Sequence, residues 1–158
     1  MKIAVDHLFL APREDLWNLL LDPARLARCI PGCDQMQEVG PDSYSATMQI
    51  GVASVRGTYV GRVEISEKER PSRYRLSIEG SGAPGFVRGH AAFDLMEQGE
   101  RQTRLSLNGE AQVGGMIGSV GQRFLVSIAR QMIGSFFKNI EQELLAAAQS
   151  SGRIGSDG

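Results

Sequence analysis

The stretch from Gly114 to Leu144, GGMIGSVGQRFLVSIARQMIGSFFKNIEQEL, carries the strongest structural signal in the chain. Its apolar residues recur every three or four positions, the period of one face of an α-helix. The residues on this face are Ile117, Val120, Phe124, Ile128, Met132, Phe136, Ile140 and Leu144. The pattern predicts an amphipathic helix of about thirty residues. A helix of this kind needs a second layer against which to bury its apolar face.

The chain before this helix has the pattern of β-strands. Alternation over residues 2–10 predicts a first strand, and Pro12 and the Asp22-Pro23 pair delimit two short helices in tandem. From Gln35 to Val113 the apolar period is two, interrupted by short turns, which favours antiparallel meanders. The strands predicted in this region are 35–39, 43–50, 54–68, 72–80, 86–97 and 102–113.

These elements predict an α+β helix-grip fold. A curved antiparallel sheet of about seven strands wraps around the long C-terminal helix, with two short helices after the first strand. We expect a single domain over residues 1–148. The last residues, 149–158, are polar and rich in Gly and Ser, and we expect them to form a disordered tail.

Composition excludes several classes of protein. The chain has 158 residues, a net charge of -1 and a pI of about 6.1, so no global field attracts nucleic acid. No window resembles a signal peptide or a membrane-spanning helix. With only two cysteines, we expect a cytoplasmic protein of a reducing compartment.

The placement of glycines points to a site. The predicted apolar faces of four strands thin to Gly or Ala toward one end, for example from Tyr74 to Gly80 and from Leu105 to Gly109. Small inward residues indicate a bend in the sheet, a close approach of backbones, or a cavity. We favour a cavity, because a sheet that bends around a helix needs glycine at only a few corners.

We expect this cavity between the sheet and the last helix. Its mouth is predicted at the Gly82–Gly89 hairpin and the Gly51–Ser54 turn. The predicted lining residues of the walls and mouth are His7, Met48, Tyr59, Phe86, Gly89, Phe93, Leu107, Met116, Val120 and Phe124. Methionine and phenylalanine suit an adaptable apolar wall.

No metal site or catalytic constellation is predicted. Cys29 and Cys33 have no second cysteine pair, and His7 and His90 lie far from them in the sequence, whereas zinc requires three or four ligands. A regulatory disulfide is an alternative, but we favour two small, half-buried residues at a turn from helix to strand. His7 is the best inward polar residue, and no carboxylate is placed in the sequence to orient it.

The last helix is unusual in its charges. Between Gly114 and Ile140 it carries Arg123, Arg130 and Lys138 and no acidic residue. A second apolar stripe runs beside the first, through Leu125, Ala129, Ile133 and Phe137. Three interpretations stay open: the paired N-terminal helices cover this stripe, it lines a cavity, or residues 116–137 contact an anionic membrane surface.

Four stretches together resemble the CoxG family of carbon monoxide dehydrogenase subunits, within the START-like (SRPBCC) superfamily. They are DPARLARCIPGCDQM (22–36), YSATMQIGVASVRGTYVGRVEI (44–65), GAPGFVRGHAAFDL (82–95) and NGEAQVGGMIGSVGQRFL (108–125). The similarity extends over roughly residues 1–148. In that family the Cys-Pro-Gly-Cys turn recurs without a known metal.

The resemblance implies a non-enzymatic accessory protein of a molybdenum hydroxylase of the carbon monoxide dehydrogenase type. Such a protein holds a hydrophobic molecule, a quinone or a lipid, and links the enzyme to the inner face of the membrane. Longer members carry a Pro-rich spacer and an apolar tail that this sequence lacks. Two alternatives remain: a cyclase or aromatase that uses His7, and an assembly factor with a filled core.

Overall fold

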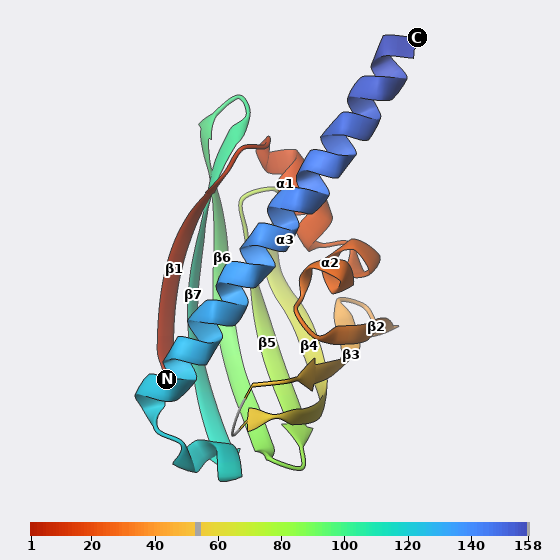
Figure 1. The fold of residues 1–158 in the computed structure, drawn as a ribbon. Coiled ribbons are helices and arrows are strands. Elements are labelled where there is room, and N and C mark those ends of the chain that lie inside the picture. The colour runs from red at the N-terminus through yellow and green to blue at the C-terminus, as the bar shows by residue number, and fades with distance from the viewer. Residues whose placement is uncertain (53–54, 158) are drawn as a thin grey trace.

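The computed structural model describes the backbone of residues 1–52 and 55–157 and the side chains of residues 1–52 and 55–150. In this part of the chain, antiparallel strands form one seven-stranded sheet in the order β1-β7-β6-β5-β4-β3-β2 (Figure 1). The strands are β1 (Lys2–Phe9), β2 (Cys33–Gly40), β3 (Ser43–Ile50), β4 (Gly57–Glu69), β5 (Arg73–Gly82), β6 (Gly85–Gly99) and β7 (Gln102–Gly115). The helices are α1 (Arg13–Leu20), α2 (Pro23–Cys29), the 3-10 helix η2 (Met116–Ser119) and α3 (Gln122–Asp157).

The layers are those of the predicted helix-grip fold, which is confirmed. The sheet curves around α3, which crosses one of its faces obliquely, and α1 and α2 lie on the same side near one end (Figure 1). Since β1 and β2 occupy opposite edges of the sheet, α1 and α2 carry the chain from one edge to the other. The main packing partners of α3 are β1, α1 and α2.

The Asp22-Pro23 pair separates the two short helices, as predicted. The Asp22 carboxylate accepts hydrogen bonds from the backbone N–H groups of Ala24 (3.1 Å) and Arg25 (3.4 Å), and Pro23 occupies the first turn of α2. The carboxylate therefore satisfies N–H groups that have no partner inside the helix. Proline fits this position because its missing N–H would have no helical partner there.

The long helix begins later than the sequence predicts. Strand β7 continues to Gly115, η2 follows, and α3 begins only at Gln122. The φ angles of Gly115 and Gly121 are 77° and 97°, in the left-handed region that an α-helix cannot contain. The expectation of a continuous helix that directly follows Gly114-Gly115 is therefore wrong at its start. At its other end, the backbone of α3 continues to Asp157. Most residues of the tail predicted over 149–158 have side chains outside the described part of the structure.

Strand β4 also begins later than its predicted range of 54–68. It starts at Gly57, and Ser54 lies outside the described residues. The backbone N–H of Val55, which precedes the strand, donates to the carbonyl of Val52 (3.0 Å).

The core fills the end of the molecule where α1 and α2 lie. Its fully buried side chains include Phe9, Leu16, Leu19, Leu20, Leu95, Leu105 and Ile140. Aromatic rings close this end: Tyr74 stacks on Phe93 with centroids 4.9 Å apart, and Trp17 meets Tyr74 edge-to-face at 5.6 Å. Offset and edge-to-face pairs of this kind add to the stability that burial provides.

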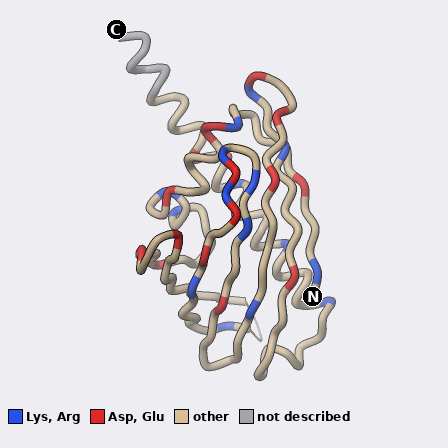
Figure 2. The backbone as a smooth tube through the Cα atoms, turned by 180° about the vertical axis from the view of Figure 1, so that it is seen from behind, with Lys and Arg blue, Asp and Glu red and all other residues tan. Residues whose placement is uncertain are grey.

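The other face of the sheet is charged. Figure 2 shows basic and acidic residues interleaved along the strands when the molecule is seen from behind. Cross-strand ion pairs join Glu79 to Arg88 (3.2 Å) and Glu67 to Arg75 (3.4 Å), all with exposed side chains. Exposed pairs contribute little to stability individually. They mark this face as the one in contact with water.

Candidate ligand-binding cavity

A cavity of about 470 Å³ lies between the inner face of the sheet and the first half of α3. Strands β3 to β7 supply most of its wall, and residues of β1, η2 and α3 supply the rest together with Met1 and Val55. The lining residues are Met1, Ile3, Met48, Ile50, Val55, Tyr59, Leu76, Ile78, Gly80, Val87, Ala91, Phe93, Leu107, Gly109, Glu110, Ala111, Val113, Ile117, Leu125, Ile128, Ala129, Met132 and Ile133. Its size falls within the range typical of small-molecule sites.

Small residues on neighbouring strands create this space. At Gly80 the nearest atom to an added Cβ would be 4.0 Å away, and at Gly109 all neighbours would be at 3.4 Å or more. Ala91 and Ala111 continue the small surface on β6 and β7. Branched side chains at these positions would fill the space, so the cavity results directly from the choice of residue.

Other glycines serve the close approach of strands instead. An added Cβ would lie 2.8 Å from the Glu79 carbonyl oxygen at Gly61 and 2.6 Å from the Glu110 oxygen at Gly89. At Gly82 it would collide with the Thr58 carbonyl oxygen. Both interpretations of the glycine pattern therefore hold, each at different positions.

The interior of the cavity offers a ligand almost no polar group. The Tyr59 hydroxyl donates to the Val55 carbonyl at 2.6 Å, and burial raises its pKa, so the phenol stays neutral. Glu110 lies between the inward residues Gly109 and Ala111, and its exposed side chain belongs to the opposite face. The described lining therefore suits hydrocarbon and not a charged or strongly polar molecule.

A larger hollow, of about 830 Å³, lies mainly on the charged face of the sheet. Its lining includes Arg62, Glu64, Arg88, His90 and Glu110. The ion pairs of this face are exposed, so water already satisfies them. We therefore assign the candidate site to the apolar cavity, on the basis of its chemistry and not of its size.

The structure brings four of the predicted lining residues together in the cavity: Met48, Tyr59, Phe93 and Leu107. All four lie on strands, where alternation assigns each side chain to one face. Lining residues that were not predicted include Ile78, Val87 and Val113, although each shares the inward alternation of its strand. They also include Leu125, Ala129, Met132 and Ile133, whose spacing on α3 is helical.

The structure places the other predicted residues elsewhere. Met116 and Phe124 are 73% and 40% exposed. Val120 packs against a cluster of buried residues that includes the lining residues Tyr59 and Ile117. Phe86 is exposed and packs over Gly114. Side chains alternate between the two faces along β6, and Phe86 lies on the outer face, opposite to that of its neighbour Val87.

Gly89 lies at a close approach between β6 and β7. Of the predicted mouth, the Gly82–Gly89 hairpin joins β5 and β6. The Gly51–Ser54 turn falls partly outside the described residues.

His7 points inward on β1 but lies outside the cavity lining. Its ring lies 4.6 Å from that of Phe9 and 5.2 Å from that of Phe137, and its Nε2 contacts a carboxylate oxygen of Glu141 on α3. The expectation that no carboxylate accompanies His7 is therefore wrong. Because α3 passes over β1 here, two residues 134 positions apart in the chain become neighbours. The pair joins helix and sheet edge at the surface and places no acid-base group in the cavity.

The cysteines are free thiols in this structure, with Cys29 buried and Cys33 half-buried. Burial raises the pKa of both thiols, which disfavours the reactive thiolate. Across residues 1–52 and 55–150, no group of three or more His, Cys, Asp or Glu side chains is arranged to hold a metal ion.

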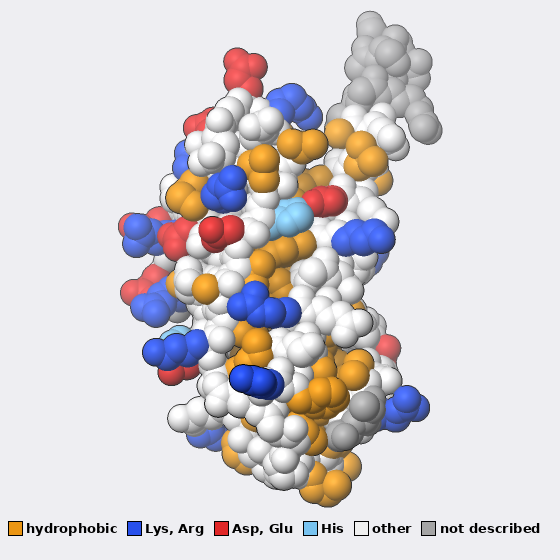
Figure 3. Space-filling model, turned by 60° about the vertical axis from the view of Figure 1, so that its left-hand side comes forward, with side chains coloured by type: hydrophobic (Ala, Val, Ile, Leu, Met, Phe, Trp, Pro, Cys, Tyr) orange, Lys and Arg blue, Asp and Glu red, His pale blue; other side chains and the backbone are white. Residues whose placement is uncertain are grey.

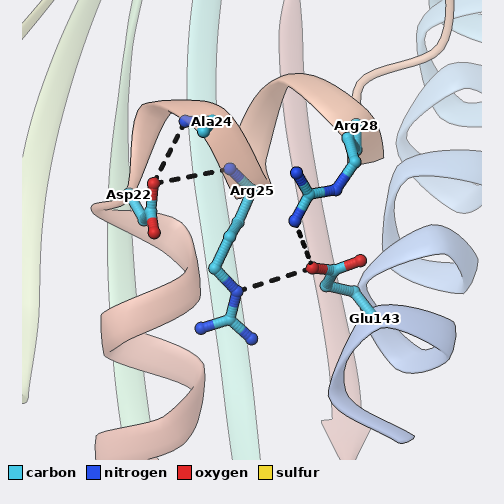
Figure 4. A network of polar contacts seen from close by, with 5 residues as sticks. All are labelled: Asp22, Ala24, Arg25, Arg28 and Glu143. Atoms are coloured by element: carbon cyan, nitrogen blue, oxygen red, sulfur yellow. Dashed lines mark hydrogen bonds and ion pairs between the residues drawn. The ribbon is translucent and has the colours of Figure 1, made fainter. Parts of the chain in front are cut away.

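Helix α2 holds the second half of α3. Arg28 and Arg25 both reach the Glu143 carboxylate, at 2.7 and 3.5 Å, as Figure 4 shows. The Asn139 amide donates to the Cys29 carbonyl at 2.9 Å. These contacts fix α3 beyond the cavity, whereas its first half lies over the cavity.

The second apolar stripe of α3 faces the interior. Leu125, Ala129 and Ile133 line the cavity, and Phe137 is buried in the core. The interpretation that the paired N-terminal helices cover the whole stripe is therefore wrong, because α1 and α2 pack near the later part of α3. None of the described helices has a stretch long and apolar enough to cross a membrane.

Comparison with known proteins supports both the family and the fold. A family model described as CoxG, one of the carbon monoxide dehydrogenase subunits, matches residues 9–145. A conserved protein from Geobacillus kaustophilus, solved by crystallography, is 34% identical, with a TM-score of 0.91 over 93% of this chain and 97% of the other. No curated protein matches the chain.

More distant structures share the fold alone. A START superfamily protein from Mycobacterium smegmatis has a TM-score of 0.75 at 11% identity, over 92% of this chain and 98% of the other. A protein from Thermus thermophilus has a TM-score of 0.70 at 15% identity, over 93% and 99% of the two chains.

Proposed function

Since the chain belongs to the CoxG family of carbon monoxide dehydrogenase subunits, we propose that it is an accessory protein that carries a hydrophobic ligand. The ligand, a quinone or a lipid, occupies the cavity between the sheet and α3. The protein serves a molybdenum hydroxylase of the carbon monoxide dehydrogenase type and brings the ligand to it from the membrane. It performs no chemistry on the ligand itself.

The observation that carries this proposal is the apolar lining of the 470 Å³ cavity. Burial of hydrocarbon contributes about 0.8 kcal/mol for each methylene group. A chain of about fifteen carbons therefore gains on the order of 12 kcal/mol before the cost of association, which is ~4 kcal/mol or more. The remainder is compatible with a dissociation constant of about 1 μM.

The end of the molecule that contains the cavity also supports contact with a membrane. Met116 and Phe124 are exposed there, close in sequence to the lining residues Ile117 and Leu125. The exposed residues Arg123 and Arg130 lie on the same part of α3. Apolar side chains beside basic ones suit the surface of an anionic bilayer. A ligand would then enter and leave near the lipid phase.

Native mass spectrometry of the protein purified from its own host, followed by organic extraction, tests ligand binding. We expect a stoichiometric lipophilic adduct, which the extract identifies. A ligand-free mass, together with failure to take up added menaquinone and fatty acids, would overturn the proposal. It would favour an assembly factor that docks on the enzyme through its surface.

Vesicle sedimentation tests the membrane contact. We expect the protein to sediment with vesicles that contain anionic lipid and to remain in solution with neutral vesicles. Replacing Met116 and Phe124 together by serine removes two exposed apolar side chains and is expected to weaken binding at least tenfold. The exposed Leu145, far along α3 from this end, provides a matched control as Leu145→Ser. Equal loss in both variants would contradict a specific membrane-facing end.

A further inference from the structure

We propose that the cavity holds only the hydrocarbon tail of its ligand, to a limit of about fifteen carbons, and leaves the polar head outside. This inference rests on the proposed function, because it takes ligand binding as given. It specifies which part of the ligand is recognised and predicts a measurable limit on chain length.

The described lining is almost entirely apolar, and its polar groups are already engaged within the protein, which disfavours a head inside. The Met1 ammonium at its edge donates to the Ala111 carbonyl at 2.9 Å. The strands of the wall use their backbone groups in the sheet, and the Tyr59 hydroxyl already donates to the Val55 carbonyl. A quinone ring or a carboxyl group inside would leave its oxygens without donors, which is costly in an apolar enclosure. A tail has no such groups. Prenyl and acyl tails share this chemistry.

The filled core gives the cavity a fixed floor. Phe93 and Leu107 line the cavity and also belong to the core cluster, with 5% and 7% of their surface exposed. Behind Phe93, Tyr74 and Trp17 continue the packed aromatic rings. A tail therefore cannot advance toward α1, because side chains already occupy that space.

We expect the cavity to open along the seam between β1 and α3. Met1, Ile3 and Ala111 line the cavity on the sheet side of this seam. Figure 3 shows hydrophobic side chains gathered at the surface between the sheet edge and the helix, over the lower half of the molecule. A head that remains outside would lie at such an opening, in contact with water or lipid.

The volume sets the limit on length. A group the size of a water molecule takes up about 30 Å³, and a methylene is of similar size, so the 470 Å³ cavity accommodates about fifteen of them. This corresponds to about three isoprene units or to an acyl chain of middle length. Longer tails extend out of the cavity and gain nothing further from it.

A chain-length series on the delipidated full-length protein tests this limit. Saturated fatty acids from about eight to about twenty-two carbons are titrated against a displaced fluorescent fatty acid. The affinity is expected to rise by about fourfold for each added methylene and to level off near fifteen carbons. Prenyl alcohols of one to four isoprene units form the second arm, which distinguishes a quinone-type tail from an acyl tail.

Two variants move the limit in a predictable direction. Gly109→Leu and Gly80→Leu each place four carbons in open space within the cavity. Each variant is expected to shorten the limit by about four carbons. Asn108→Leu is the matched control, because Asn108 is exposed on the other face of β7, and it should leave the limit unchanged. If one glycine variant does not fold, the other carries the test.

The unaltered protein provides a test of the head. A fatty acid, its alcohol and its methyl ester of equal length should bind within about threefold of one another, because their heads remain outside. A preference above tenfold for one head would overturn the inference. An affinity that keeps rising past twenty carbons, or a limit that neither glycine variant moves, would also overturn it while ligand binding stands. Failure of every chain length to bind would instead overturn the proposed function.

Discussion

The two ends of the space beneath α3 differ although the same strands run through both. On β5 the inward residues change from Tyr74 in the core to Gly80 at the cavity. On β7 they change from Leu105 to Gly109. The helix behaves likewise, since Ile140 is fully buried whereas Ile133 lines the cavity. Side-chain volume along continuous strands, and not a break in the sheet, therefore separates the stable core from the site.

The largest difference between the ends is expected from truncation of the helix. Ile140→Ala removes a fully buried side chain and should lower the free energy of unfolding by about 2–5 kcal/mol. Ile133→Ala should cost about half as much, because Ile133 already faces a void and has fewer contacts to lose. Urea denaturation of both variants provides the measurement. Equal losses would indicate that the cavity end is packed as densely as the core.

Glycines of the two kinds allow a second comparison. Gly89→Leu should destabilise the fold by about 1–3 kcal/mol, since its Cβ would lie 2.6 Å from the Glu110 carbonyl oxygen. Gly109→Leu meets no atom closer than 3.4 Å at its Cβ and should change stability by less than about 1 kcal/mol. Thermal melts of the two variants provide the measurement. Similar behaviour would mean that Gly109, too, serves only the approach of strands.

Removal of the N-cap of α2 tests whether this helix, which packs against the later part of α3, contributes to stability alone or also to ligand binding. Asp22→Ala removes the acceptor of the Ala24 and Arg25 N–H groups and is expected to cost about 1 kcal/mol. Ligand affinity should stay within about twofold, because α2 contributes no residue to the cavity lining. Denaturation and ligand titration on the same sample check both statements. A large loss of affinity would show that α2 controls the cavity through α3.

The smallest effect is expected from the ion pairs of Glu143. Its hydrogen bond from Arg28 lowers the pKa of the Glu143 carboxyl below 4.5 in the folded protein. The unfolded chain therefore binds a proton more readily, and the stabilisation is present above pH 4.5 and is lost as the pH falls through the folded-state pKa. Glu143→Gln should lower the melting temperature at pH 7 by no more than a few degrees. The difference in melting temperature between the variant and the unaltered protein should disappear at acid pH. A difference that does not depend on pH would contradict this account.

Four lining residues on strands could be predicted from the sequence, whereas those named on the last helix could not. Alternation assigns Met48, Tyr59, Phe93 and Leu107 to the inner face wherever the strand lies in the sheet. The phase of a helix depends on where it begins. Because Gly121 separates η2 from α3, Leu125 faces the cavity while Phe124 is exposed. The sequence shows glycine at 121 but not its φ angle.

The order of elements, the helix-grip fold and the family could be predicted from the sequence, because these depend on periodicity, turn residues and motifs within short stretches. The tertiary structure was needed to tell which glycines make space and which let strands approach, since that depends on atoms of the neighbouring strand. It also paired His7 with Glu141, 134 residues away, and placed α2 against α3. Such contacts follow from how the layers meet, and no local pattern in the chain encodes them.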